Sequence, residues 1–195
     1  MKWKIEDFLD QFIPNGSSVL DLGSGLTSPI LRIRNKIKYT GLDIKFSSEK
    51  LNVIQGNVLD AEKIFTEKFD VVVALDLIEH LEKIDGHRLL EIMYNLSNKK
   101  IIIFTPNGFM PEEGTEENPY LKHLSGWNMI DFESNGFKVY GIGGLKDLHF
   151  LDPINKIPIL NKFYGILLAF TNKITWENPE VAYNLIAIKE VEVLK

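Results

Sequence analysis

The sequence predicts an α/β domain in which a mostly parallel β-sheet is covered by helices on both faces. From about residue 16, short apolar runs typical of strands alternate with helical patterns, as in sheets built from strand-helix-strand units. The runs at residues 71–73 and 101–103 are apolar throughout, which suits strands that are buried on both faces. The length of 195 residues corresponds to a single domain, 1–195, with room for a modest insertion.

Seven strands are expected in this chain, at residues 19–22, 39–42, 51–54, 69–75, 100–104, 137–142 and 182–188. A helix is expected after the fourth strand, where apolar residues recur at helical spacing: Leu81, Ile84, Leu89, Ile92 and Leu96. A second helix is expected over residues 127–135, with Ser125 as its N-cap and Gly136 as its C-terminal glycine.

Two segments exceed what a minimal alternating domain needs. Residues 107–124 follow the fifth strand, at the edge where open parallel sheets bind ligands, and are expected to form a lid. Residues 144–179, between the sixth and seventh strands, are expected to form a helical insertion with an apolar stripe between Pro158 and Trp176. Three roles stay open for the stripe: covering the substrate pocket, forming a homodimer interface, or touching a membrane surface. Contact with a membrane surface is the least favoured of the three roles, because few lysines flank the stripe.

The composition narrows the class of protein. The chain is 45% hydrophobic and 25% charged, which is typical of soluble globular proteins. A net charge of −5 argues against a nucleic acid as partner. There is no cysteine for a disulfide or a thiolate metal site. The acidic residues Glu6 and Asp7 stand where a secretory signal would need an apolar run. The longest apolar run, 166–170, is far shorter than the roughly 20 residues of a transmembrane segment. We expect a cytoplasmic protein without a transmembrane segment.

The most informative segment is the turn after the first strand. The strand leads into Gly23, Ser24 and Gly25, and then into Ser28 and Pro29, a helix cap followed by a first-turn proline. Such glycines let the backbone approach a ligand, and free N–H groups at a helix start favour a carboxylate or a phosphate. A nicotinamide-binding turn is disfavoured, because Ser28 stands where the third glycine of that motif belongs and the acid Asp21 interrupts a strand that is normally apolar.

The acid and glycines at positions 21, 23 and 25 resemble the first motif of class I S-adenosylmethionine-dependent methyltransferases. The resemblance implies that Asp21 helps to hold the amino-acid end of S-adenosyl-L-methionine, and that Asp43, at the end of the second strand, accepts the two ribose hydroxyls. It also implies that Asn57 stands in place of the family's aspartate at the adenine edge. The implied cofactor site comprises Asp21, Gly23, Ser24, Gly25, Asp43, Ile44, Asn57, Val58 and Leu75.

The strand at residues 69–75 and its exit extend the resemblance. This run ends in Glu79, His80 and Leu81 and is similar to a family run ending in Glu-His-Leu, best in the branch called methyltransferase type 11. Thr27 departs from the family, in which many members have a third glycine at that position. The resemblance covers residues 16–143 and the last strand. It implies a Rossmann-like sheet of seven strands in the order 3-2-1-4-5-7-6, with strand 7 antiparallel.

Three residues are candidates for catalysis. His80 is the leading base, because its place in the family faces the crevice and imidazole titrates near neutral pH. Asp76, at the tip of the fourth strand, orients the substrate or the cofactor, and His123 reaches the pocket from the other side. Each has a purely structural alternative: a helix-start residue, a hydrated loop residue, or a polar residue before a cap. The acids and histidines form no ligand cluster recognisable in the sequence, so no metal is expected.

The expected function is methyl transfer to a small-molecule, glycan or lipid-precursor acceptor, most simply at oxygen. The chain lacks the Asn/Asp-Pro-Pro-aromatic motif with which nucleic-acid methyltransferases grip an exocyclic amine. Two rival functions stay open. One is a nicotinamide-dependent oxidoreductase, and the other is a non-catalytic binding module that retains the fold, which Thr27 and the unplaced base keep under consideration.

Overall fold

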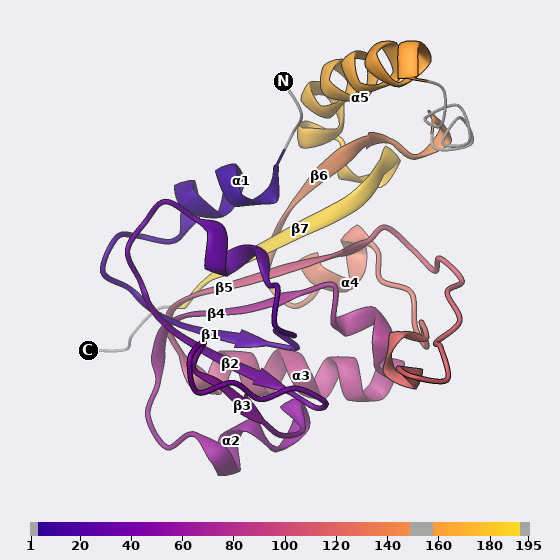
Figure 1. The fold of residues 1–195 in the computed structure, drawn as a ribbon. Coiled ribbons are helices and arrows are strands. Elements are labelled where there is room, and N and C mark those ends of the chain that lie inside the picture. The colour runs from indigo at the N-terminus through magenta and orange to yellow at the C-terminus, as the bar shows by residue number, and fades with distance from the viewer. Residues whose placement is uncertain (1–3, 149–157, 192–195) are drawn as a thin grey trace.

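The sheet of this chain contains seven strands in the order β3-β2-β1-β4-β5-β7-β6, as seen in a computed structural model that describes residues 4–148 and 158–191. Strands β1 to β5 are parallel, whereas β7 runs antiparallel to both of its neighbours, β5 and β6. Figure 1 shows the twisted sheet with helices on either side. The expected fold class, strand order and antiparallel seventh strand are confirmed.

All seven strands lie where the apolar runs predict them: β1(Ser18–Leu22), β2(Lys38–Asp43), β3(Val53–Gln55), β4(Phe69–Leu75), β5(Ser97–Pro106), β6(Lys138–Leu145) and β7(Ala182–Glu190). The third strand starts later than expected, because Asn52 adopts a positive φ of 53° and turns the chain just before it. Strand β5 is longer than its apolar run, since it continues into Pro106 at the edge that carries the site.

Two apolar clusters cover the two faces of the sheet. On one face the sheet packs against α2(Ala61–Ile64), α3(Lys83–Leu96) and α4(Met129–Glu133). On the other face it packs against α1(Ile5–Phe12) and the 3₁₀ turn η1(Pro29–Arg32). Ser28 caps this turn, as expected, by accepting a hydrogen bond from the backbone N–H of Ile30 at 3.2 Å. The helix expected after the glycine turn is thus only the four residues of η1.

One helix cap differs from the expectation. The helix after β5 starts at Met129, and its N-cap is Asn128, which accepts from the N–H of Asp131 while Asp131 accepts from the N–H of Asn128. The prediction of Ser125 as the cap is wrong. Its hydroxyl instead accepts a hydrogen bond from the indole N–H of Trp127 at 2.9 Å. The reciprocal capping box satisfies two backbone donors and so outcompetes the earlier serine.

The segment 144–179 contains the long helix α5(Pro158–Glu177), which packs against β6 beyond the end of the sheet (Figure 1). Residues 149–157 of this segment lie outside the described part of the chain. Ile166 and Phe170 on α5 are exposed. Within the described residues, no helix has both the length and the apolar character that a membrane crossing requires.

The strand register places the functional side chains at one edge. Leu22 of β1 pairs with Leu42 of β2 and with Ala74 of β4, so that Gly23, Asp43 and Leu75 come next along their strands at the same edge. The carboxyl ends of parallel strands point the same way, and open sheets bind ligands at this edge. The fold therefore brings together residues that lie far apart in the sequence.

Candidate functional site

A cavity of about 240 Å³ lies at the carboxyl edge of β1, β2 and β4. Its walls come from five segments: the glycine turn, the end of β2, the segment after β3, the segment after β4, and the loop 107–124. The described residues that line it are Gly23, Ser24, Gly25, Asp43, Ile44, Lys45, Phe46, Asn57, Val58, Asp76, Leu77, His80, Leu81, Asn118, Tyr120 and Leu121.

The glycine turn needs both of its glycines, for different reasons. Gly23 has a φ of +71°, and a Cβ added to it would lie 2.6 Å from Cδ1 of Leu77, so no larger residue fits without displacement. Gly25 has a φ of +53°, and a Cβ added there would meet no atom within 4 Å, because it would project into open space. The turn therefore presents bare backbone to the cavity at Gly25.

Asp43 fastens this turn to the end of β2. Its Oδ2 accepts a hydrogen bond from the N–H of Gly25 at 2.8 Å, and its Oδ1 accepts from the N–H groups of Lys45 and Phe46 at 2.9 and 3.0 Å. A carboxylate offers about four acceptor positions, so these bonds leave about one for a ligand. The geometry thus leaves less than the two acceptors implied for the ribose hydroxyls.

Asp21 lies beneath the turn and does not line the cavity. It is 1% exposed, its Oδ2 accepts from the hydroxyl of Tyr39 at 3.2 Å, and its Oδ1 has no hydrogen-bond partner. Burial raises the pKa of the Asp21 carboxyl to about 7. Burial of the Tyr39 hydroxyl and the neighbouring Asp21 carboxylate raise the pKa of Tyr39. A buried acceptor without a partner is costly, and a donor from a bound ligand would satisfy it.

The other implied cofactor residues divide into two groups. Ile44, Asn57 and Val58 line the cavity, whereas Leu75 does not. The side-chain oxygen of Asn57 accepts from the N–H of Leu59 at 3.0 Å and caps the 3₁₀ turn η2(Val58–Asp60). This cap fixes the side chain and leaves its amide N–H groups available to the cavity.

The segment after β4 supplies the opposite wall. Asp76 lines the cavity with a positive φ of 48°, an uncommon conformation for a residue other than glycine. The 3₁₀ turn η3(Ile78–His80) follows, with Glu79 buried and His80 at the cavity wall. Burial and the neighbouring Asp76 carboxylate raise the pKa of Glu79, whereas desolvation lowers the pKa of His80.

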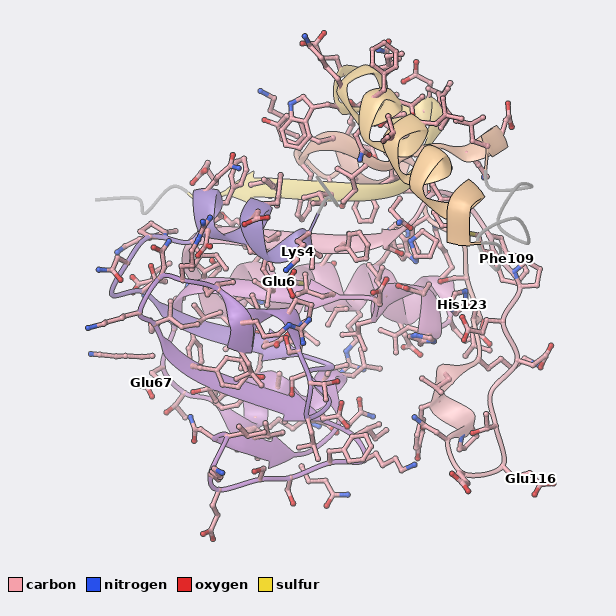
Figure 2. All side chains as sticks on the ribbon, turned by 45° about the horizontal axis from the view of Figure 1, so that its top comes forward. Lys4, Glu6, Glu67, Phe109, Glu116 and His123 are labelled. Carbon is pink, nitrogen blue, oxygen red and sulfur yellow. The ribbon has the colours of Figure 1, made fainter. Side chains whose placement is uncertain are left out.

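His123 lies behind His80 and does not line the cavity. The two imidazole rings stand edge to face with their centroids 4.8 Å apart. Figure 2 shows His123 at the base of the projecting loop that carries Glu116 near its far end. Of the three candidate catalytic residues, the structure thus places Asp76 and His80 at the cavity and His123 one layer away.

Two features of the site escaped sequence reasoning. Glu79 was part of a motif, but nothing in the sequence indicated that it lies beside His80 and His123, with one ligand atom of each within 4.8 Å of the others. The sequence predicts the loop 107–124 near the cavity, but no motif in it indicates that Asn118 and Leu121 line the cavity. The side-chain oxygen of Asn118 is buried without a hydrogen-bond partner, as is Oδ1 of Asp21.

Known proteins resemble this chain in structure and not in sequence. No protein-family model matches it, and no curated protein matches its sequence. A methyltransferase from Archaeoglobus fulgidus, described as dependent on S-adenosylmethionine, superposes with a TM-score of 0.59 at 19% identity, covering 95% of this chain and 92% of the other. Coclaurine N-methyltransferase, solved with N-methylheliamine and S-adenosylhomocysteine, gives 0.59 at 14% identity, covering 94% and 70%.

A third similar structure is the magnesium protoporphyrin IX methyltransferase of Synechocystis PCC 6803 with bound S-adenosylhomocysteine. It superposes with a TM-score of 0.55 at 14% identity and covers 96% of this chain and 82% of the other. The acceptors named for these proteins differ widely, so the likeness shows the fold alone. That fold is the Rossmann-like fold of class I methyltransferases.

Proposed function

We propose that this chain is a methyltransferase that transfers the methyl group of S-adenosyl-L-methionine to a small-molecule, glycan or lipid-precursor acceptor, at oxygen. One observation carries the proposal: Gly25, Asp43 and Asn57 all line one cavity at the carboxyl edge of the sheet. The methyltransferase fold supports it, because the solved relatives hold S-adenosylhomocysteine.

The residues present fit such a cofactor. The open space beside Gly25 suits the amino-acid end of the cofactor bound near the turn. Asp21 is buried beneath the turn and does not line the cavity, so its unpartnered Oδ1 would meet that end only after a local rearrangement. Asp43 keeps about one acceptor position for a ribose hydroxyl, and Asn57 keeps its amide donors for the edge of a base. When bound, the cofactor would supply an electrophilic methyl group.

The chain's own residues would hold and prepare the acceptor. His80 carries a pKa lowered by desolvation, so its imidazole is largely neutral at neutral pH and is suited to accept a proton from an acceptor hydroxyl. Asp76 stands beside it on the cavity wall and would orient the acceptor. We also propose that residues 107–124 act as a lid, since Asn118, Tyr120 and Leu121 already line the cavity.

Calorimetric titration of the full chain with S-adenosyl-L-methionine and S-adenosylhomocysteine tests the proposal, with reduced nicotinamide dinucleotide as the control ligand. We expect binding in the micromolar range that Asp43→Ala weakens at least tenfold, about 1.4 kcal/mol. The matched control is Glu67→Ala, which removes an exposed acid before β4, far from the cavity (Figure 2). Absence of binding by the wild type, or equal binding by Asp43→Ala, overturns the cofactor assignment.

Three finer assignments accompany the proposal. Membership of the methyltransferase type 11 branch rests on the run ending in Glu79, His80 and Leu81. The cytoplasmic location and a homodimer through residues 144–179 stay predictions. If the chain binds the cofactor but methylates no compound in a broad panel of hydroxyl acceptors, the non-catalytic binding module is favoured instead.

A further inference from the structure

Three side chains with metal-ligand chemistry converge beside the cavity. Glu79, His80 and His123 each offer one ligand atom, and these atoms all lie within 4.8 Å of one another. Glu79 and His80 are neighbours in η3, whereas His123 arrives from the end of the loop 107–124. The backbone N–H groups of Leu124 and Ser125 donate to the carbonyl oxygen of Glu79 at 2.8 and 3.1 Å, which locks the two segments together.

Both histidines are held in the form that binds metals. Nδ1 of His80 lies 3.2 Å from the carbonyl oxygen of Lys122, and Nδ1 of His123 lies 2.6 Å from that of Met110. A carbonyl oxygen only accepts hydrogen bonds, so each Nδ1 must carry the proton. The lone pair of each neutral ring is then on Nε2. Metal-binding histidines usually donate their other ring N–H to a carbonyl or a carboxylate in this way.

Glu79 lacks a cation. Its side chain is 2% exposed, and among the described residues it forms no ion pair with a lysine, arginine or histidine. Its Oε2 accepts a hydrogen bond from the hydroxyl of Thr105 at 2.9 Å, which aims the carboxylate but supplies no positive charge. Burial and the Asp76 carboxylate raise the pKa of Glu79 to about 8, so in the metal-free chain its carboxyl keeps a proton near neutral pH, and a metal ion would displace that proton on binding.

We propose that Glu79, His80 and His123 bind one divalent transition-metal ion through a carboxylate oxygen and two Nε2 atoms. Two imidazoles and one carboxylate favour an ion such as Zn²⁺ over Mg²⁺, which prefers oxygen ligands. Ligands about 2.1 Å from a tetrahedral zinc ion lie about 3.4 Å apart, so binding would draw the three groups, now within 4.8 Å of one another, closer by up to about 1.4 Å.

The surroundings leave room for further ligands. Oε2 of Glu112 lies 3.4 Å from Nε2 of His123, so this largely exposed carboxylate would lie beside an ion bound there. His80 lines the cavity, so a remaining coordination position faces the space assigned to the acceptor. There a bound ion would hold an oxygen of the acceptor and orient it, and His80 would then act as a metal ligand and not as the base. This last role rests on the proposed function, whereas metal binding itself does not.

Titration of the chelator-treated full chain with ZnCl₂ and with MgCl₂ tests the site by calorimetry, and the visible absorption of added Co²⁺ reports coordination. We expect one Zn²⁺ per chain, at least tenfold tighter than Mg²⁺. His80→Asn and His123→Asn keep a donor near the position of Nδ1 and delete Nε2. Each is expected to weaken Zn²⁺ binding about 100-fold and to abolish the Co²⁺ spectrum.

The matched control is His87→Asn, which removes a histidine of α3 outside the cluster and should leave Zn²⁺ binding unchanged. Thermal unfolding of the metal-free variants shows whether each has folded. Wild-type binding weaker than about 100 μM, or unchanged binding by both folded cluster variants, overturns the metal site. Zn²⁺ binding by a chain that does not bind S-adenosyl-L-methionine would leave the metal site standing and remove the proposed function.

Discussion

The two sides of the cavity are built on different principles. On the proposed cofactor side, backbone N–H groups of the turn Gly23 to Gly25 donate to the carbonyl oxygen of Leu42 and to the side-chain carboxylate of Asp43, at the ends of adjacent strands. On the proposed acceptor side, Glu79 and His80 meet His123, which lies more than 40 residues further along the chain. Each side buries a carboxylate, Asp21 or Glu79, that forms no ion pair within the described residues. The first side is therefore fixed by the sheet, and the second depends on how a loop is anchored.

Trp127→Ala should break the acceptor side and give the largest loss of stability. Trp127 is fully buried, its ring packs on Phe132, and its indole N–H donates to Ser125 at the end of the loop. Truncating a buried tryptophan costs about 3–5 kcal/mol, which urea unfolding measures. Zn²⁺ binding should weaken, whereas binding of S-adenosyl-L-methionine should persist under conditions in which the variant is folded.

The matched control for this prediction is Phe109→Ala, which truncates an exposed aromatic residue at the other end of the same loop (Figure 2). Its stability should stay within about 0.5 kcal/mol of the wild type. If Trp127→Ala and Phe109→Ala cost the same, the loop is not anchored through the tryptophan.

Asp21→Asn should change the pH dependence of stability. Burial raises the pKa of Asp21 from 3.8 to about 7 in the folded state, so between these values the folded chain keeps a proton that the unfolded chain has lost. This group's contribution therefore makes the free energy of unfolding fall as the pH rises, by about 2 kcal/mol between pH 4 and pH 6. The variant should lack this decline.

Urea unfolding of both proteins at several pH values measures the difference. The control is Asp70→Asn at the opposite edge, where the Lys99 ammonium and backbone N–H of Ser18 lower the pKa of the carboxyl. Asp70 stabilises the fold above its unfolded pKa and loses that effect as the pH falls, so its replacement has the opposite pH trend. A wild-type curve parallel to that of Asp21→Asn would show that folding does not shift the pKa of Asp21.

Gly25→Ala should separate binding from stability on the cofactor side. An alanine at a φ of +53° costs about 1 kcal/mol, and its methyl group would project into the cavity without touching the protein. We expect binding of S-adenosyl-L-methionine to fall at least tenfold by calorimetry. Gly16→Ala, at a φ of +85° and also without a contact, should cost similar stability and leave binding intact. Equal binding by both variants would place the ligand away from Gly25.

The sequence predicted the cofactor side better than the acceptor side for a physical reason. Strand positions follow from local periodicity and the glycine turn is a local motif, whereas Asp43 was implied by the family resemblance and lies at the common edge at which parallel strands end. Asp21 shows the limit of this reasoning, since its side chain is buried under the turn and does not line the cavity. The meeting of Glu79 with His123 depends on loop packing, for which the sequence carries no periodic signal.

Lys45→Ala should have the smallest effect and tests whether the two sides act together. The ammonium of Lys45, beside the cofactor side, donates to the carbonyl oxygen of Glu117 in the loop 107–124 at 2.5 Å. The bond is exposed, so its loss should change stability by less than about 0.5 kcal/mol. If the loop is a lid, the lost tether should speed release of S-adenosyl-L-methionine about two- to fivefold in stopped-flow measurements. Lys50→Ala, which removes another exposed lysine of the same connection, should leave the release rate unchanged. Equal release rates in all three proteins would mean that the loop does not gate the cofactor, and the two sides of the cavity would then work independently.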